Sequence, residues 1–161
     1  MQTMEFKELM GQFAAASGVT DAAADEMGAW HFSIDDMTVS FEADEASGEL
    51  ATYALVGELP PEGREQLYCL MLESMFRGEG TDCATLSIAH ESDKVYLHRI
   101  DPIAALDLER FRSILERFAN VLEEWRKMLD DFRAVVPAIE RAAAAEEKER
   151  RNLERNEFMQ V

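Results

Sequence analysis

The sequence predicts an α+β fold, in which helices pack on a twisted antiparallel sheet and a long helix closes the chain. Three observations support this prediction. Apolar residues recur with helical spacing towards both ends of the chain, they alternate with period two in between, and the alternating runs cluster without a helical crossover between them. Strands joined by short turns pair antiparallel, so the predicted order is α-β-β-β-α-β-β-α.

Residues 2–16 are expected to form the first helix. Four large apolar side chains fall at the spacing i, i+3, i+4 and i+7, which places them on one helical face: Phe6, Leu9, Met10 and Phe13. Gly18 ends the helix and opens a stretch of small residues that reaches Gly28.

Three strands are expected next, over residues 29–35, 37–44 and 50–59. In the first two, apolar and polar residues alternate; the apolar ones are Trp30, Phe32, Ile34, Met37, Val39, Phe41 and Ala43. Asp35-Asp36 forms the turn between them, because aspartate tolerates turn geometry. The third range is apolar on both faces, which predicts a central position in the sheet.

Pro60-Pro61 ends the third strand and precedes a second helix, expected over residues 62–76. Gly78 and Gly80 close this helix. Its middle, residues 67–72, is apolar almost all round, and such a helix has to be buried on two sides. In a chain of 161 residues, another subunit is a plausible source of the second covering surface.

Two further strands are expected over residues 84–90 and 94–100, joined by a polar turn. A long helix starts near Asp107. Its apolar residues step by three and four: Leu108, Phe111, Leu115, Phe118, Leu122, Trp125, Leu129, Phe132, Val136 and Ile139. Pro137 is expected to kink or interrupt this helix. We therefore divide the chain into an α+β domain, residues 1–130, and a helical C-terminal extension, residues 131–161.

The chain is strongly acidic, with a formal net charge of −17. Residues 1–60 contain twelve acidic residues and one basic residue, and residues 61–161 contain twenty-one acidic and fifteen basic residues. Such a surface repels phosphate backbones and anionic lipid headgroups, so neither nucleic acid nor a membrane is expected as a partner. No signal peptide and no apolar run of ~20 residues is recognised, so a soluble, cytoplasmic protein is expected.

No motif for catalysis or cofactor binding is recognised. The histidines His31, His90 and His98 lie in predicted strands. His90 and His98 flank one hairpin and could face each other, but a metal site would need a third ligand such as Glu91 or Asp93, and ordinary strand histidines are expected. Cys69 and Cys83 belong to no paired motif, and reduced cysteines are expected, although one bridge is possible. The sequence contains no glycine-rich phosphate loop and no nucleophile elbow. We expect no enzyme activity, no cofactor and no metal.

The order of elements and four local features resemble the class I type III secretion chaperones, the Tir-chaperone family. These features are the opening helix with Phe6 and Leu9-Met10, the turn Gly57-Glu58-Leu59-Pro60, the leucine-rich helix Leu67–Phe76, and the closing helix with Phe118 and Trp125. The resemblance covers residues 4–130. It leaves residues 131–161 unexplained; they extend a dimer interface, cover a groove, contact another component, or form a floppy tail.

The resemblance implies a homodimeric bacterial chaperone that binds the extended N-terminal segment of a secreted effector before export. It implies client contacts on the first helix and the sheet, by Met10, Phe13, Trp30, Phe32, Ile34, Val39 and Phe41. It implies a dimer interface on the second helix and fourth strand, formed by Leu67, Leu70, Met71, Met75, Leu86 and Ile88. Two alternatives remain open: a structural or regulatory protein of the same fold without a secreted client, and an assembly protein that oligomerises through residues 107–155.

Overall fold

The computed structural model of the chain describes residues 6–18 and 24–158. It contains one five-stranded sheet, in which all neighbouring strands are antiparallel. The strands are β1 (Trp30–Ile34), β2 (Met37–Asp44), β3 (Glu49–Glu58), β4 (Thr85–Ile88) and β5 (Lys94–Pro102). Their order in the sheet is β1-β2-β3-β5-β4, so β3 is central, as its two apolar faces predict.

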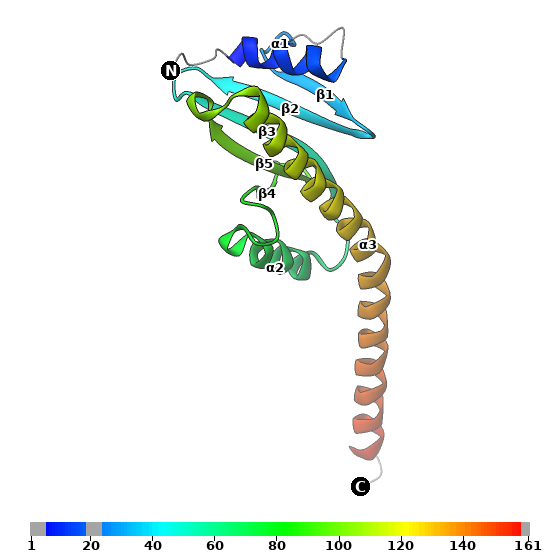
Figure 1. Ribbon diagram of the computed structural model, residues 1–161. Coiled ribbons are helices and arrows are strands. Elements are labelled where there is room, and N and C mark those ends of the chain that lie inside the picture. Colours follow the sequence, from blue (N-terminus) through cyan, green and yellow to red (C-terminus); the bar gives the residue numbers. More distant parts are fainter. Residues whose placement is uncertain (1–5, 19–23, 159–161) are drawn as a thin grey trace.

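Three helices accompany the sheet (Figure 1). They are α1 (Phe6–Ser17), α2 (Arg64–Met75) and α3 (Leu108–Phe158), with two single 3₁₀ turns, η1 (Phe76–Gly78) and η2 (Ile103–Ala105). The α+β class and the predicted order of elements are confirmed. The predicted first helix began at residue 2, and the part before Phe6 lies outside the described residues.

Pro137 was expected to kink or interrupt the closing helix, and the interruption is wrong, because α3 is one helix of 51 residues. Proline removes the hydrogen bond to the carbonyl four residues earlier, here that of Arg133. Residues 134 and 135 are exposed, so water can solvate a carbonyl in this part of the helix. Figure 1 shows that α3 changes direction as it leaves the sheet.

One cluster of phenylalanines holds α1 and α3 on the same face of the sheet. Phe13 of α1 makes edge-to-face contacts with Phe32 of β1 and Phe111 of α3, both with ring centroids 5.1 Å apart. Phe41 of β2 lies 5.7 Å from Phe32 and 5.3 Å from Phe111. All four side chains are buried. This arrangement is favourable beyond the buried area, because aromatic rings prefer edge-to-face contacts at such distances.

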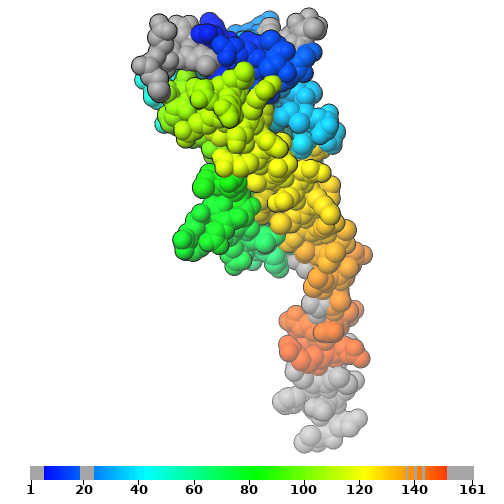
Figure 2. All heavy atoms as spheres, viewed as in Figure 1, coloured from blue at the N-terminus to red at the C-terminus, as the bar shows by residue number. Residues whose placement is uncertain are grey.

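α3 contacts the body of the molecule beyond the division at residue 130. Leu129 packs at Gly57 of β3, and both Phe132 and Val136 pack at Gly63 before α2. From residue 138 to residue 151, every side chain that the structure describes is exposed. Figure 2 shows this part of the chain leaving the body as a narrow arm. The packed part of the chain therefore reaches Val136, and the exposed arm begins just after it.

The connection between α2 and β4 is attached to α3. The indole Nε1–H of Trp125 donates a hydrogen bond to the carbonyl of Gly80 at 3.0 Å, and Arg117 pairs with Asp82 at 3.2 Å. Thr81 is fully buried, and its hydroxyl donates to the carbonyl of Ala84 at 2.6 Å. These contacts fix α2 beside β4, at the edge of the sheet opposite β1.

We predict that Gly63→Ala destabilises the fold more than Gly48→Ala. Both glycines have positive φ, 72° and 70°, so both substitutions carry a backbone cost of about 1–2 kcal/mol. At Gly63 the new Cβ would lie 2.3 Å from Cγ1 of Val136, whereas at Gly48 it meets no atom within 4 Å. Overpacking should add about 1–3 kcal/mol at Gly63 only. Urea unfolding measures the difference, and equal losses would contradict the packing of α3 on this loop.

Candidate functional site

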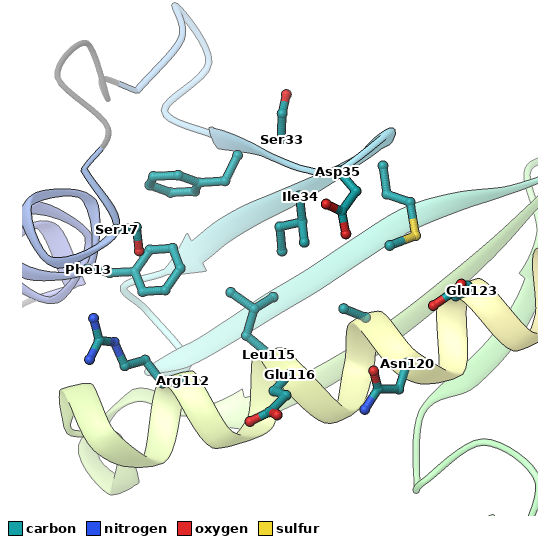
Figure 3. Close-up of a pocket in the computed structure, with 13 residues that line it drawn as sticks. Phe13, Ser17, Ser33, Ile34, Asp35, Arg112, Leu115, Glu116, Asn120 and Glu123 are labelled. Carbon is teal, nitrogen blue, oxygen red and sulfur yellow. The ribbon is translucent and has the colours of Figure 1, made fainter.

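A groove of about 450 Å³ opens between α1, β1 and α3, and we call it the α1–β1–α3 groove (Figure 3). Its floor is apolar, with Phe13, Phe32, Met37 and Leu115 buried beneath it and Ile34 and Ala119 half-buried at its surface. The other lining residues are polar or charged: Ser17, Ser33, Asp35, Arg112, Glu116, Asn120 and Glu123. An apolar floor with a polar rim is typical of binding sites.

The charges on the rim are arranged along the groove. Arg112 lies at the end next to α1 and Phe13, whereas Asp35 and Glu123 lie towards the opposite end, as Figure 3 shows. Asp35 occupies the β1–β2 turn with a φ of 51°, a left-handed conformation that aspartate adopts more readily than most residues. Glu116 lies between Arg112 and Glu123 on α3.

β1 is an edge strand, paired with β2 on one side. At the first residue of β1, Trp30, the preceding segment folds back and Ala24 forms an isolated bridge. In the same segment, the backbone N–H of Asp25 donates to the carbonyl of Ala29 at 2.8 Å. Among the described residues, no strand pairs with the other side of β1 over 32–34. That stretch borders the α1–β1–α3 groove, so an extended chain could both add to the sheet and place side chains in the groove.

The segment before β1 is held by a short hydrogen-bonded chain. The carboxylate of Asp25 accepts the backbone N–H groups of Met27 and Ala29 and contacts His31 Nε2 at 3.1 Å, while His31 Nδ1 lies 2.9 Å from the hydroxyl of Ser40. The pKa of Asp25 is lowered, mainly by the hydrogen bond from His31 and then by that from Ala29. The arrangement keeps Asp25 ionised and the segment ordered.

The sheet face opposite to α1 and α3 carries a second groove, of about 520 Å³, around Tyr53, Tyr96, His98 and Ile100. Burial and the neighbouring carboxylate of Glu42 raise the pKa of Tyr53 to about 12. Burial lowers the pKa of His98, so this imidazole stays neutral near pH 7. Tyr53 donates a hydrogen bond to Glu42 and packs edge-to-face with Tyr96.

A third surface lies where α2 meets β4, and we call it the α2–β4 surface. It contains a small, almost entirely apolar groove of about 220 Å³, lined by Tyr68, Met71, Leu72, Met75, Leu86, Ser87 and Ile88. Leu72 is 66% exposed and the adjoining Phe76 is 71% exposed. Together with the apolar groove beside them, these side chains form a contiguous exposed apolar patch, which is typical of an interaction surface.

The structure divides the residues expected to contact a client. Met10, Phe13, Phe32, Val39 and Phe41 are buried in the core of the subunit, whereas Trp30 and Ile34 are half-buried. Phe13, Phe32 and Ile34 line the α1–β1–α3 groove. The alternation of β2 did not reveal which face is covered, and α3 covers the face that carries Val39 and Phe41. Val39 and Phe41, like Met10, are therefore core residues of the subunit and are not accessible to a client.

The residues expected at the dimer interface divide in the same way. Leu67, Met71 and Leu86 are buried in the core, Leu70 and Met75 are half-buried, and Ile88 is 39% exposed. The two most exposed apolar side chains of this region, Leu72 and Phe76, were missed. A helix that is apolar almost all round does not by itself show which of its faces is turned to solvent. The position of β4 beside α2 settles this.

The remaining candidates gather no reactive centre in the described residues. His90 is exposed beside Glu91, and both Cys69 and Cys83 are free, exposed thiols. Within residues 6–18 and 24–158, no three His, Cys, Asp or Glu side chains are grouped so that they could hold a metal ion. None of the helices in this part of the chain is long and apolar enough to cross a membrane.

One protein-family model matches most of this chain. It is the model of the Tir chaperone protein (CesT) family, and the match covers residues 8–126. No curated protein gives a significant match.

Several solved structures share the fold. The ExsC-ExsE complex is similar with a TM-score of 0.65 and 22% identity, over 79% of this chain and 95% of the matched chain. The HopA1-SchA chaperone-effector complex gives a TM-score of 0.61 and 16% identity, over 76% and 93%. The Yersinia pestis type III secretion chaperone SycH, in complex with a stable fragment of YscM2, gives 0.58 and 18%, over 75% and 99%.

We predict that Phe32→Ala and Ile34→Ala, two changes on β1, differ strongly in their effect on stability. Phe32 is 3% exposed and belongs to the phenylalanine cluster, so its truncation should lower the free energy of unfolding by about 3–5 kcal/mol. Ile34 is half-buried at the surface of the groove, and its truncation should cost about 1 kcal/mol. Urea unfolding of both variants tests the assignment, which fails if Ile34→Ala is the more damaging.

Proposed function

The chain belongs to the Tir chaperone protein (CesT) family, and we propose that it binds an extended N-terminal segment of a type III secreted effector and keeps it soluble and competent for export. The observation that carries the proposal is the α1–β1–α3 groove beside the unpaired stretch of β1. The solved structures that share the fold include the HopA1-SchA chaperone-effector complex.

The geometry suits an unfolded client. A disordered segment has a large ordering cost, so it needs both main-chain hydrogen bonds and several apolar contacts to remain bound. The edge of β1 supplies backbone donors and acceptors, and the floor formed by Phe13, Ile34 and Leu115 supplies the apolar contacts. Binding of this kind requires no catalytic group and no cofactor, so the proposal includes no enzyme activity. Since the client is held before export, the proposed location is the bacterial cytoplasm.

The proposed chaperone is a homodimer, formed through the α2–β4 surface. Leu72 on α2, Phe76 in the following turn η1 and Ile88 on β4 expose apolar area on one side of the subunit, next to the groove of about 220 Å³. Burying this surface against a second copy removes it from water, at roughly 25 cal/mol per Å². The surface lies at the edge opposite β1, so a dimer formed there leaves both α1–β1–α3 grooves open.

We predict that the chain captures a client through the N-terminal region of that client, and that this capture depends on Ile34 of the chain. The tagged chain, expressed in its own bacterium, should co-purify with one larger protein, and limited proteolysis should leave the N-terminal part of that protein bound. Ile34→Asp places a charge at the groove and should reduce capture at least tenfold, because a charge buried under the client lacks a partner. Ile139→Asp, at an exposed site on the arm, is the matched control and should not change capture.

The client proposal fails if the wild-type chain retains no partner, or if Ile34→Asp and Ile139→Asp retain the same amount. The first result would favour a protein of the same fold that has no secreted client.

We predict that Leu72→Asp combined with Phe76→Asp converts the dimer to a folded monomer. Both side chains are exposed, so the substitutions should leave the unfolding transition nearly unchanged while placing charges in the interface. Light scattering measures the mass. A chain that ends at Val136 lacks the arm, including the exposed Ile139, and should remain dimeric. If this truncation instead yields monomers while the Leu72→Asp, Phe76→Asp variant stays dimeric, assembly through the long helix is favoured.

A further inference from the structure

We propose that the α1–β1–α3 groove selects client segments by charge as well as by apolar character. It accepts an apolar anchor that has a basic residue on the side of Asp35 and Glu123 and an acidic residue on the side of Arg112. The inference rests on the proposed function and names the chemistry of the segment that the groove takes.

The spacing of the rim charges defines the pattern. Arg112, Glu116 and Glu123 all line the groove from α3, one turn and about two further turns apart along the same side of the helix. At 1.5 Å per residue, Arg112 and Glu123 are separated by roughly 16 Å along the helix axis. An extended chain covers about 16 Å in five residues. Because successive side chains of an extended chain point to opposite faces, two charges and an anchor that all face the groove occupy alternate positions. The two complementary charges of a client are therefore expected four positions apart, about 13 Å, with the anchor midway between them, and the long side chains of Arg112 and Glu123 cover the remaining distance.

The rim charges are available to a partner. In the part of the chain that the structure describes, the ion pairs within 4 Å do not involve Asp35, Arg112, Glu116 or Glu123. At the acidic end, Arg126 and Lys127 of α3 line an adjoining groove together with Glu123, and Arg126 pairs with Asp36 at 3.1 Å. Among the described residues, the carboxylates that line the α1–β1–α3 groove therefore have no ion-pair partner within 4 Å.

The electrostatic field of the acidic chain attracts the basic residue of the client more than the acidic one. Residues 1–60, which supply α1, β1 and β2, hold twelve acidic residues and one basic residue. A client cation is attracted both by this field and by Asp35 and Glu123, whereas a client anion finds local compensation at Arg112 alone. The anchor side chain meets Phe13, Ile34 and Leu115 whatever the charges, so charge here adjusts affinity and register.

The test uses three fluorescent peptides of eleven residues and the full-length chain at ~0.15 M salt. Each peptide has a central leucine among threonine and serine residues. The two positions that lie two residues before and two residues after the leucine, on the same face of the extended chain, carry Asp and Lys, Ser and Ser, or Asp and Asp. We expect the Asp–Lys peptide to bind best and the Asp–Asp peptide to bind worst. Exposed ion pairs typically change affinity about 1.4- to 5-fold each, so the extremes should differ roughly tenfold.

Two variants on α3 distinguish the groove from the general field. Glu123→Lys leaves the carboxylate of Asp35 opposite a new cation, so it should reduce the difference between the Asp–Lys and Asp–Asp peptides from roughly tenfold to about twofold or less. Glu124→Lys makes the same change in net charge one residue along, at a position that does not line the groove, and should leave that difference nearly unchanged. Equal effects of the two variants would overturn the proposal, because the preference would then be long-range attraction alone.

The outcomes also separate this proposal from the proposed function. If all three peptides bind equally and Ile34→Asp abolishes their binding, the groove takes extended segments but the charge pattern is wrong. If none of the peptides binds, while the client captured from cells also binds without regard to Ile34, both proposals fail.

Discussion

Phe13, Phe32, Phe41 and Phe111 form the contact on which the rest of the structure depends. Their rings lie 5.1–5.7 Å apart and join α1, the first hairpin and α3 in one buried cluster. The cluster forces both helices onto the same face of the sheet. The α1–β1–α3 groove lies open between these helices and is bounded by the edge strand β1.

The strand order assigns different surfaces to the two edges of the sheet. β1 lies at one edge, where the groove and an unpaired stretch of strand adjoin each other. β4 lies at the other edge, where Leu72 of α2 and Phe76 of η1 are exposed. Exposed strand edges and apolar patches both promote association. Because the two surfaces lie at opposite edges of the sheet, the proposed dimer would leave the α1–β1–α3 groove of each subunit open to an extended segment.

The arm of α3 remains outside both surfaces. The family match ends at residue 126, yet the helix packs on the body as far as Val136 and continues to Phe158. Its exposed part is rich in alanine and in charges of both signs, such as the pair of Arg151 and Glu147 one turn apart. Such pairs stabilise a solvated helix, so the arm does not require a covering partner to be helical.

The sequence by itself determined the class and the order of the elements, because periodicity reports how many faces of a segment are buried. The alternation of residues 37–44, the two apolar faces of β3 and the stepped stripe of α3 all led to the correct element. The family resemblance was inferred from the same order of elements together with four degenerate local motifs, none of which is specific alone, and the family match agrees with it.

Only the tertiary structure decided which of those faces is covered, because alternation is the same whether a strand turns its apolar side inwards or outwards. Val39 and Phe41 were expected to meet a client and lie in the core, whereas Leu72 and Phe76 were missed and stand exposed. The charge count likewise gave an acidic chain but not the separation of Arg112 from Asp35 and Glu123 along the groove. That separation arises where a helix and a turn distant in sequence meet, and no local pattern records such a meeting.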